Sequence, residues 1–158
     1  IKTTLEETAI ASLMNQSSNY LMAEHNPKKL GTLHPNIAPY GDIINSTDGT
    51  KLILAIGTDK QFVSFCELIK LTASIDFNTN QKRVAKREEL MKIINDKTSV
   101  LKSSWLLENC HNRQIPIGKI KTVEEVMQER IAQEMILEEM VDGFQTKRIK
   151  TNSFELLN

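Results

Sequence analysis

The stretch "DIINSTDGTKLILAIG", residues 42–57, is the feature that most limits what this chain can fold into. The dipeptide Asp48-Gly49 lies between two apolar runs. Glycine tolerates a positive φ angle and aspartate bonds to its own backbone, so the dipeptide predicts the tight turn of a β-hairpin. The second run, Leu52 to Ile56, is continuously apolar, which predicts a strand buried on both faces. Such a hairpin needs helices packed against it.

Helix signals surround this hairpin. Predicted capping boxes at Thr4–Glu7, Thr58–Gln61 and Thr122–Glu125 each mark the start of a helix. Apolar periodicity predicts helices over residues 5–23, 59–69, 81–97 and 99–114. The segment "IPIGKI" reads as a short extended piece. Asp142-Gly143 predicts a second hairpin, with continuation of the preceding helix through Ile136 as the alternative. The expected fold class is therefore α+β.

Length and charge exclude several classes of function. The chain has 158 residues, which predicts one domain or slightly more. Basic and acidic residues number 20 each, and a net charge of zero argues against a nucleic-acid or anionic-membrane binder. The stretch "QKRVAKR", with Lys82, Arg83, Lys86 and Arg87, is interpreted as a solvated helix face. No apolar run reaches membrane-spanning length.

The chain carries few signals of catalysis or metal binding. Cys66 and Cys110 lie in apolar helical patterns, which predicts buried thiols in a reducing compartment and hence a cytoplasmic protein. No spaced set of His and Cys indicates a metal. Neither a nucleophile elbow nor a phosphate-binding loop is present. His111 falls at a predicted helix C-terminus and is interpreted as a capping or surface residue.

The stretch "KKLGTLHPNIAPYGDI", residues 28–43, has no apolar rhythm that suits a helix or a strand. Pro35 biases His34 towards an extended backbone, and Gly31 permits dihedral angles that other residues avoid. A rigid loop that presents His34 and Tyr40 would either shape a pocket or simply cross between two elements. The residues alone leave both interpretations open.

The order of these motifs resembles that in one known family. "NYLM", "KKLGTLHPNIAPYGDI", "STDGTKLILAIGTDKQF", "FNTNQKRVAKREEL", Trp105, "IPIGKI" and "VEEV" follow one another as in the C-terminal half of family III CoA-transferases. That group includes formyl-CoA transferase, carnitine CoA-transferase and α-methylacyl-CoA racemase. The resemblance covers nearly the whole chain and is weakest after Arg130.

The resemblance implies a domain arrangement. Residues 1–40 would form a linker helix and a proline-rich crossing loop, and residues 41–113 a small α+β domain with an antiparallel sheet packed by helices. Residues 114–158 would return towards a Rossmann-like large domain that is missing from this chain. Family members form interlocked homodimers, so a homodimer is expected, with neither nucleic acid nor membrane as a partner.

The resemblance also implies a reaction, in which an aspartate forms an aspartyl-CoA thioester while CoA passes from an acyl-CoA to a carboxylic acid. That aspartate, and most contacts to coenzyme A, lie upstream in the family. We therefore expect no catalytic residue and no metal in this chain. The cleft-lining candidates are Lys29, Gly31, His34, Pro35 and Tyr40.

Two departures and two alternatives accompany this expectation. Lys29 stands where the family often has Arg, and it keeps the charge but loses the bidentate fork. The glycine-rich loop of formyl-CoA transferase has no counterpart, which disfavours formyl or oxalate substrates. A racemase of the same fold and a non-catalytic interaction or dimerisation module stay open. Because a helix starts almost at once and no methionine precedes it, we expect a fragment of a longer protein that is inactive alone.

Overall fold

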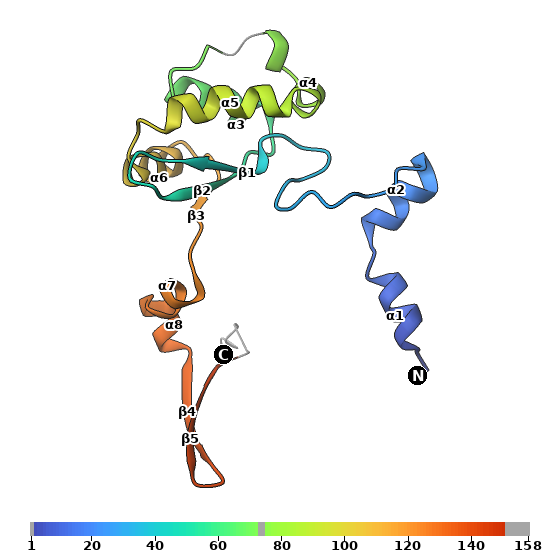
Figure 1. Ribbon diagram of the computed structural model, residues 1–158, viewed down its shortest axis with the longest axis vertical. Helices are drawn as coiled ribbons and strands as arrows, with labels where there is room; N and C mark the ends of the chain where they lie inside the picture. The colour runs from blue at the N-terminus through green and yellow to red at the C-terminus, as the bar shows by residue number, and fades with distance from the viewer. Residues whose placement is uncertain (1, 73–74, 151–158) are drawn as a thin grey trace, which may run out of the picture.

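The computed structural model describes residues 2–72 and 75–150 and shows an α+β chain, as predicted. A three-stranded antiparallel sheet with the order β1-β2-β3 lies in a compact body (Figure 1). Its strands are β1 (Tyr40–Asn45), β2 (Lys51–Ala55) and β3 (Ile117–Lys119). The helices of this body are α3 (Asp59–Leu68), α4 (Asn80–Ala85), α5 (Arg87–Thr98) and α6 (Ser103–Asn112), with a 3-10 turn at Ile75–Phe77.

The hairpin predicted at Asp48-Gly49 is confirmed. Gly49 has a φ angle of +76°, and its amide donates to the carbonyl of Ser46 at 3.1 Å. The predicted extended piece "IPIGKI" supplies β3, which pairs with the other edge of β2 and makes β2 the central strand. The body therefore depends on a strand about 60 residues downstream of the hairpin for the third member of its sheet.

The prediction that β2 is buried on both faces is wrong for one face. Leu52 and Leu54 are fully buried, whereas Ile53 and Ala55, on the opposite face, are half-buried. The core residues of the helices pack on the face of β2 that carries Leu52 and Leu54. The strand is continuously apolar, yet only this face is fully buried.

The core joins the sheet to the helices through residues of the predicted apolar faces. The capping box of Thr58 and Gln61 is present at the start of α3, as predicted, and the boxes at Thr4 and Thr122 are present as well. The principal core side chains are Ile44, Leu52, Leu54, Ile56, Phe62, Phe65, Leu90, Ile94, Leu106 and Ile115. Each is at most 1 % exposed, so the sheet and α3, α5 and α6 share one core.

The hairpin turn is linked to α6 by the carboxylate of Asp48. Its Oδ2 accepts from the amide and the hydroxyl of Ser103 at 3.1 and 2.7 Å, and its Oδ1 accepts from the hydroxyl of Ser46. The N-cap residue Lys102 makes no capping bond, so Asp48 takes this role from a distant part of the chain. Hydrogen bonds from Ser46 and Ser103 hold the pKa of Asp48 well below its usual range.

The thiols of Cys66 and Cys110 are buried, as predicted. Burial raises the pKa of each thiol to about 11. At pH 8, a thiol with a pKa of about 11 carries about 100-fold less thiolate than a thiol with its ordinary pKa. We expect alkylation by iodoacetamide to be at least about 100-fold slower in the native chain than in urea, and to accelerate with pH up to about 11. Equal rates at pH 8 in peptide mass spectra would contradict this burial.

Two arms extend away from the compact body in the same general direction (Figure 1). The first holds α1 (Leu5–Ala11) and α2 (Asn15–Ala23), and within this described segment neither helix has a buried residue. The second holds α7 (Val123–Met127), α8 (Arg130–Glu134), β4 (Ile136–Val141) and β5 (Phe144–Ile149). Asp142-Gly143 connects β4 to β5, so the predicted second hairpin is confirmed.

Two helix predictions are wrong in extent. The helix predicted over residues 5–23 is broken, because Met14 has a φ angle of +48° that a helix cannot accommodate. The helix predicted over residues 81–97 is divided at Lys86, where the backbone leaves helical geometry between α4 and α5. Within the part of the chain that the structure describes, no helix has both the length and the apolar character needed to cross a membrane.

Candidate functional site

The crossing loop, defined here as residues 24–39, runs from the end of α2 to the start of β1 beside α4 and α5 (Figure 1). Its last residues, Ile37 to Pro39, enter the body, and Ala38 and Pro39 are buried. The peptide bond between Ala38 and Pro39 is cis. Buried backbone groups require hydrogen-bond partners, so the positions of those partners show which residues hold the loop in place.

Two arginines bind the carbonyl groups of the crossing loop. Arg87 donates from Nη2 to the carbonyl oxygens of His34, at 2.8 Å, and of Ile37. Arg83 donates from Nε to the carbonyl oxygen of Ala38 at 2.8 Å. The loop is therefore held by side chains that lie about 45 to 53 residues further along the chain.

Further hydrogen bonds complete the pairing of this backbone. Asn80 donates from Nδ2 to the carbonyl of Asn36 at 2.7 Å and accepts from the amide of Ala38 at 3.1 Å. The amide of His34 donates to the carbonyl of Tyr40 at 2.9 Å. A loop without regular structure thus has an ordered hydrogen-bond network, which is typical of loops that carry function on a rigid body.

The imidazole of His34 lies against the ring of Tyr40. The ring centroids are 5.3 Å apart and the planes meet at 67°, an edge-to-face arrangement. The amide of Asn36 donates to Nδ1 of His34 at 3.1 Å. Because Nδ1 accepts this hydrogen bond, Nε2 carries the proton of the neutral ring and acts as the donor. His34 is half-buried, so one polar side chain is presented in a defined orientation.

Asp42 connects Tyr40 to Arg87 beneath the loop. Only 2 % of Asp42 is exposed, and its Oδ2 accepts from the amide of Tyr40 at 2.9 Å. Its Oδ1 lies 3.7 Å from Nε of Arg87. Burial raises the pKa of Asp42, although the positive charge of Arg87 and the amide of Tyr40 act in the opposite direction.

Of the five residues predicted to line a cleft, four fall into two pairs and Lys29 belongs to neither pair. Gly31 and Pro35 line a hollow of about 200 Å³ between α2 and the crossing loop, together with residues that include His25 and Lys28. His34 and Tyr40 meet in the ring contact described above, and Lys29 is exposed. The structure thus brings four of the five together in two pairs, while a role in binding stays a prediction for all five.

The interpretation of "QKRVAKR" as a solvated face is wrong for its two arginines. Arg83 is 2 % exposed and the side chain of Arg87 is 14 % exposed, whereas Lys82 and Lys86 are exposed. A signal was present in the sequence. Arg83 and Arg87 stand four residues apart and continue the helical spacing of the buried Leu90 and Ile94, so they belong to the inward stripe.

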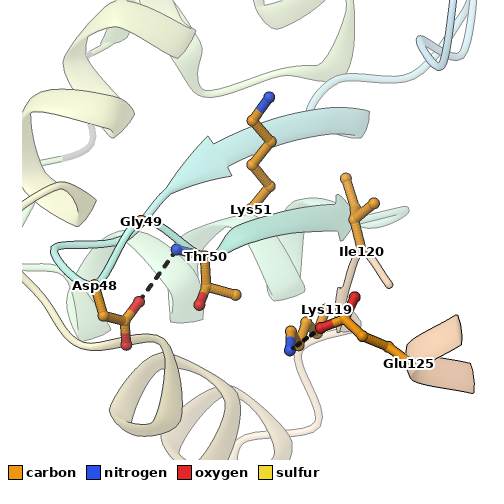
Figure 2. Close-up of a pocket in the computed structure, with 7 residues that line it drawn as sticks. All are labelled: Asp48, Gly49, Thr50, Lys51, Lys119, Ile120 and Glu125. Atoms are coloured by element: carbon orange, nitrogen blue, oxygen red, sulfur yellow. Dashed lines mark hydrogen bonds and ion pairs between the residues drawn. The ribbon is translucent and has the colours of Figure 1, made fainter. Parts of the chain in front are cut away.

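A second hollow, of about 340 Å³, lies at the other end of the sheet (Figure 2). It is lined by Asp48, Gly49, Thr50, Lys51, Lys119, Ile120 and Glu125. Figure 2 shows Lys119 turned towards Glu125, at 2.8 Å, and the amide of Thr50 directed at Asp48. The carboxylates here pair with groups of the chain itself, so the arrangement is one of structural contacts.

The described residues hold no group of three or more His, Cys, Asp or Glu side chains close enough together to bind a metal ion. The crossing loop offers a hydrogen-bond donor on His34 and cationic side chains at Lys28 and Lys29, and the adjoining strand β1 adds the aromatic hydroxyl of Tyr40. Groups of these types are chemically suited to an anionic ligand.

Comparison with known proteins supplies the context for this loop. A family model described as CoA-transferase family III matches residues 1–155. The chain is 39 % identical over 119 residues to succinate–glutarate CoA-transferase of Agrobacterium fabrum, a match that covers 73 % of this chain and 29 % of that protein. It is 31 % identical over 129 residues to human succinyl-CoA:glutarate CoA-transferase, covering 79 % of this chain and 29 % of that protein. The chain thus spans less than a third of these relatives.

Solved structures show the same fold. A CaiB/BaiF family protein from Brucella suis superposes with a TM-score of 0.67 at 33 % identity, over 80 % of this chain and 34 % of that one. Rv3272 from Mycobacterium tuberculosis superposes with a TM-score of 0.76 over 99 % of this chain and 41 % of that one, at 15 % identity. The second likeness concerns the fold alone.

Proposed function

The chain belongs to CoA-transferase family III, and on that premise we propose that it forms the C-terminal portion of an acyl-CoA:carboxylate CoA-transferase. The observation that carries this proposal is the match over residues 1–155, together with 39 % identity to a named CoA-transferase. Because the chain spans 29 % of that relative, we propose that the remaining length of the enzyme supplies the nucleophile and most of the coenzyme A site.

We propose C4 and C5 dicarboxylates as the acids between which CoA is exchanged. The bacterial and human relatives are both named for succinate or succinyl-CoA and glutarate. A dicarboxylate bound as a thioester keeps one free carboxylate, which needs a donor or a cation in the cleft. The crossing loop supplies such groups in His34, Lys28 and Lys29. We propose that it lines the acyl side of the cleft, with Gly31, Pro35 and Tyr40 shaping it.

The proposed reaction is covalent. An aspartate upstream of this chain attacks the thioester carbonyl. The CoA thiolate is expelled, and a mixed anhydride of the aspartate and the acyl group forms. The thiolate then attacks the aspartyl carbonyl, which releases the first acid and gives an aspartyl-CoA thioester. The acceptor carboxylate attacks that thioester and takes over the CoA by the same two steps in reverse. Nucleophilic catalysis of this kind divides one difficult transfer into easier ones.

The aspartates of the body support an upstream nucleophile, because three of them have structural partners. Asp42 is buried against Tyr40 and Arg87. Asp48 caps α6, and Asp59 accepts from Arg83.

We further propose the division expected from the sequence, with residues 1–40 and 114–158 leading to a large domain and residues 41–113 forming most of the small domain, to whose sheet residues 117–119 add β3. The apolar side chains exposed on the two arms support this arrangement, since they require a cover that the described residues do not supply. They include Leu5, Leu21 and Met22 on the first arm and Met140 and Phe144 on the second. Residues 151–158 lie outside the described residues. An interlocked cytoplasmic homodimer is part of the same proposal.

The test is CoA exchange by the full-length protein. Incubation with succinyl-CoA and glutarate should yield glutaryl-CoA and free succinate in equal amounts, measured by liquid chromatography and mass spectrometry. Oxalate or formate in place of glutarate should give a much lower rate. Absence of exchange over a broad panel of acyl-CoA donors and acids would reject the proposal. Deuterium uptake at the α-carbon of the acyl-CoA without an acceptor would instead identify a racemase.

A further inference from the structure

Arg87, which lies outside the crossing loop, binds backbone groups on either side of the residue that hydrogen-bonds to the His34 imidazole. Nη2 of Arg87 donates to the carbonyls of both His34 and Ile37. These carbonyls flank Asn36, whose amide donates to Nδ1 of His34. The imidazole is therefore hydrogen-bonded to a backbone segment that Arg87 binds at both ends, at His34 and at Ile37.

The guanidinium of Arg87 faces a buried carboxylate. Arg87 is the first residue of α5, and its Nε lies 3.7 Å from Oδ1 of the buried Asp42. The other oxygen of Asp42 accepts from the amide of Tyr40, whose ring packs on His34. Asp42 thus contacts both Arg87 and the backbone of Tyr40, and Tyr40 contacts His34 through its ring, so the four residues are linked around the end of the loop.

A guanidinium suits this place better than an ammonium group. One planar nitrogen of Arg87 reaches two carbonyls while another faces Asp42. Lysine would offer a compact point charge on a flexible stem, and it would not reproduce that geometry.

We propose that Arg87 is a positioning residue, which fixes the imidazole of His34 so that its Nε2–H group binds the free carboxylate of a dicarboxylate substrate. This inference rests on the CoA-transferase function proposed above. Arg87 touches the backbone of the loop rather than the substrate, and it acts through His34. His34 is then the residue that contributes to the choice of a dicarboxylate over an acid without a second carboxylate.

Chemical modification tests the positioning step without reference to activity. Diethylpyrocarbonate attacks an unprotonated imidazole nitrogen, and in His34 that nitrogen is Nδ1, which accepts from Asn36. In the full-length protein, Arg87→Lys should accelerate modification of His34 by about fivefold, the effect of losing one hydrogen bond. Peptide mass spectrometry resolves His34 from His25 and His111, whose rates should not change. An unchanged rate at His34 would overturn the inference.

Kinetics test the substrate step. His34→Gln should raise KM for glutarate about tenfold with a smaller effect on kcat, and Arg87→Lys should raise it by a similar or smaller factor. In the His34→Gln background, Arg87→Lys should change KM by less than about twofold, since the arginine acts through the histidine. Effects that multiply in the double variant would show a merely structural arginine and overturn the inference.

A control variant and two further measurements distinguish failure of the proposed function from failure of the positioning role. Arg113→Lys alters an exposed arginine, 4.0 Å from Glu67, and should leave modification rates and KM unchanged. Thermal unfolding of each variant tests whether Arg87→Lys is folded, and Arg87→Met repeats the modification measurement without the charge. If the wild-type protein transfers no CoA, the proposed function is wrong, and so is the proposal that His34 binds the free carboxylate of the substrate. The modification rates then still decide whether Arg87 orients His34.

Discussion

Replacing Arg83 with methionine is expected to destabilise the body by about 3 kcal/mol, because buried carbonyls lose their donors. Arg83 is 2 % exposed, and it donates to the carbonyls of Ala38 at 2.8 Å and Phe77 at 3.1 Å. Its guanidinium carbon also lies 4.4 Å from the centroid of the Phe62 ring. Methionine fills much of the space but satisfies neither carbonyl. Urea denaturation followed through the fluorescence of Trp105, the chain's single tryptophan, measures the loss.

Three further variants identify the origin of this effect. Arg83→Lys keeps the charge but not the fork, so an intermediate loss of about 1 to 2 kcal/mol is expected. Asp59 accepts from Arg83 at 2.5 Å but its side chain is 62 % exposed, so Asp59→Asn should cost less than about 1 kcal/mol. Lys92→Met, at an exposed position of α5, should lie within about 0.5 kcal/mol of wild type. If Arg83→Met matched Lys92→Met, the carbonyl contacts would have no energetic role.

The hairpins and the caps of this chain could be predicted because their causes are local. Gly49 and Gly143 both adopt a positive φ angle at the turns where the sequence placed them. The threonine caps of α1, α3 and α7 likewise depend on a residue only three positions away. Interactions between residues only a few positions apart can be predicted from a short sequence pattern, because both partners belong to that pattern.

The hydrogen bonds from Arg83 and Arg87 to the crossing loop were not predicted, because each arginine is far in sequence from the carbonyls that it binds. Nothing local to Arg87 indicates that two carbonyls some 50 residues upstream lie above it. A basic stretch is usually solvated, and two of its four cations here do remain in solvent. The break at Met14 had no warning glycine or proline either. For the candidate site, the sequence indicated a rigid loop that presents His34 and Tyr40, but neither the contact between their rings nor the distant residues that hold the loop.

Gly41 carries the second large effect, and Gly41→Ala is expected to cost more than about 3 kcal/mol. Gly41 has a φ angle of +78°, at an irregularity of β1 where one extra residue separates Tyr40 from Ile43 in the register with β2. A Cβ atom there would lie 1.8 Å from the carbonyl oxygen of Thr32, which is backbone and has no rotamer with which to retreat. The crossing loop would have to leave the strand.

Two other glycines separate this clash from simple backbone strain. Gly31 and Gly49 have φ angles of +65° and +76°, yet an added Cβ would meet nothing within 4 Å at either. Alanine at these positions should cost about 1 kcal/mol, the strain of the left-handed conformation alone. The difference between Gly41→Ala and Gly49→Ala in urea denaturation therefore measures how closely the crossing loop packs on β1. Equal losses would mean that Thr32 moves aside freely, and a loop that moves so freely would not hold His34 and Tyr40 in the geometry on which the site depends.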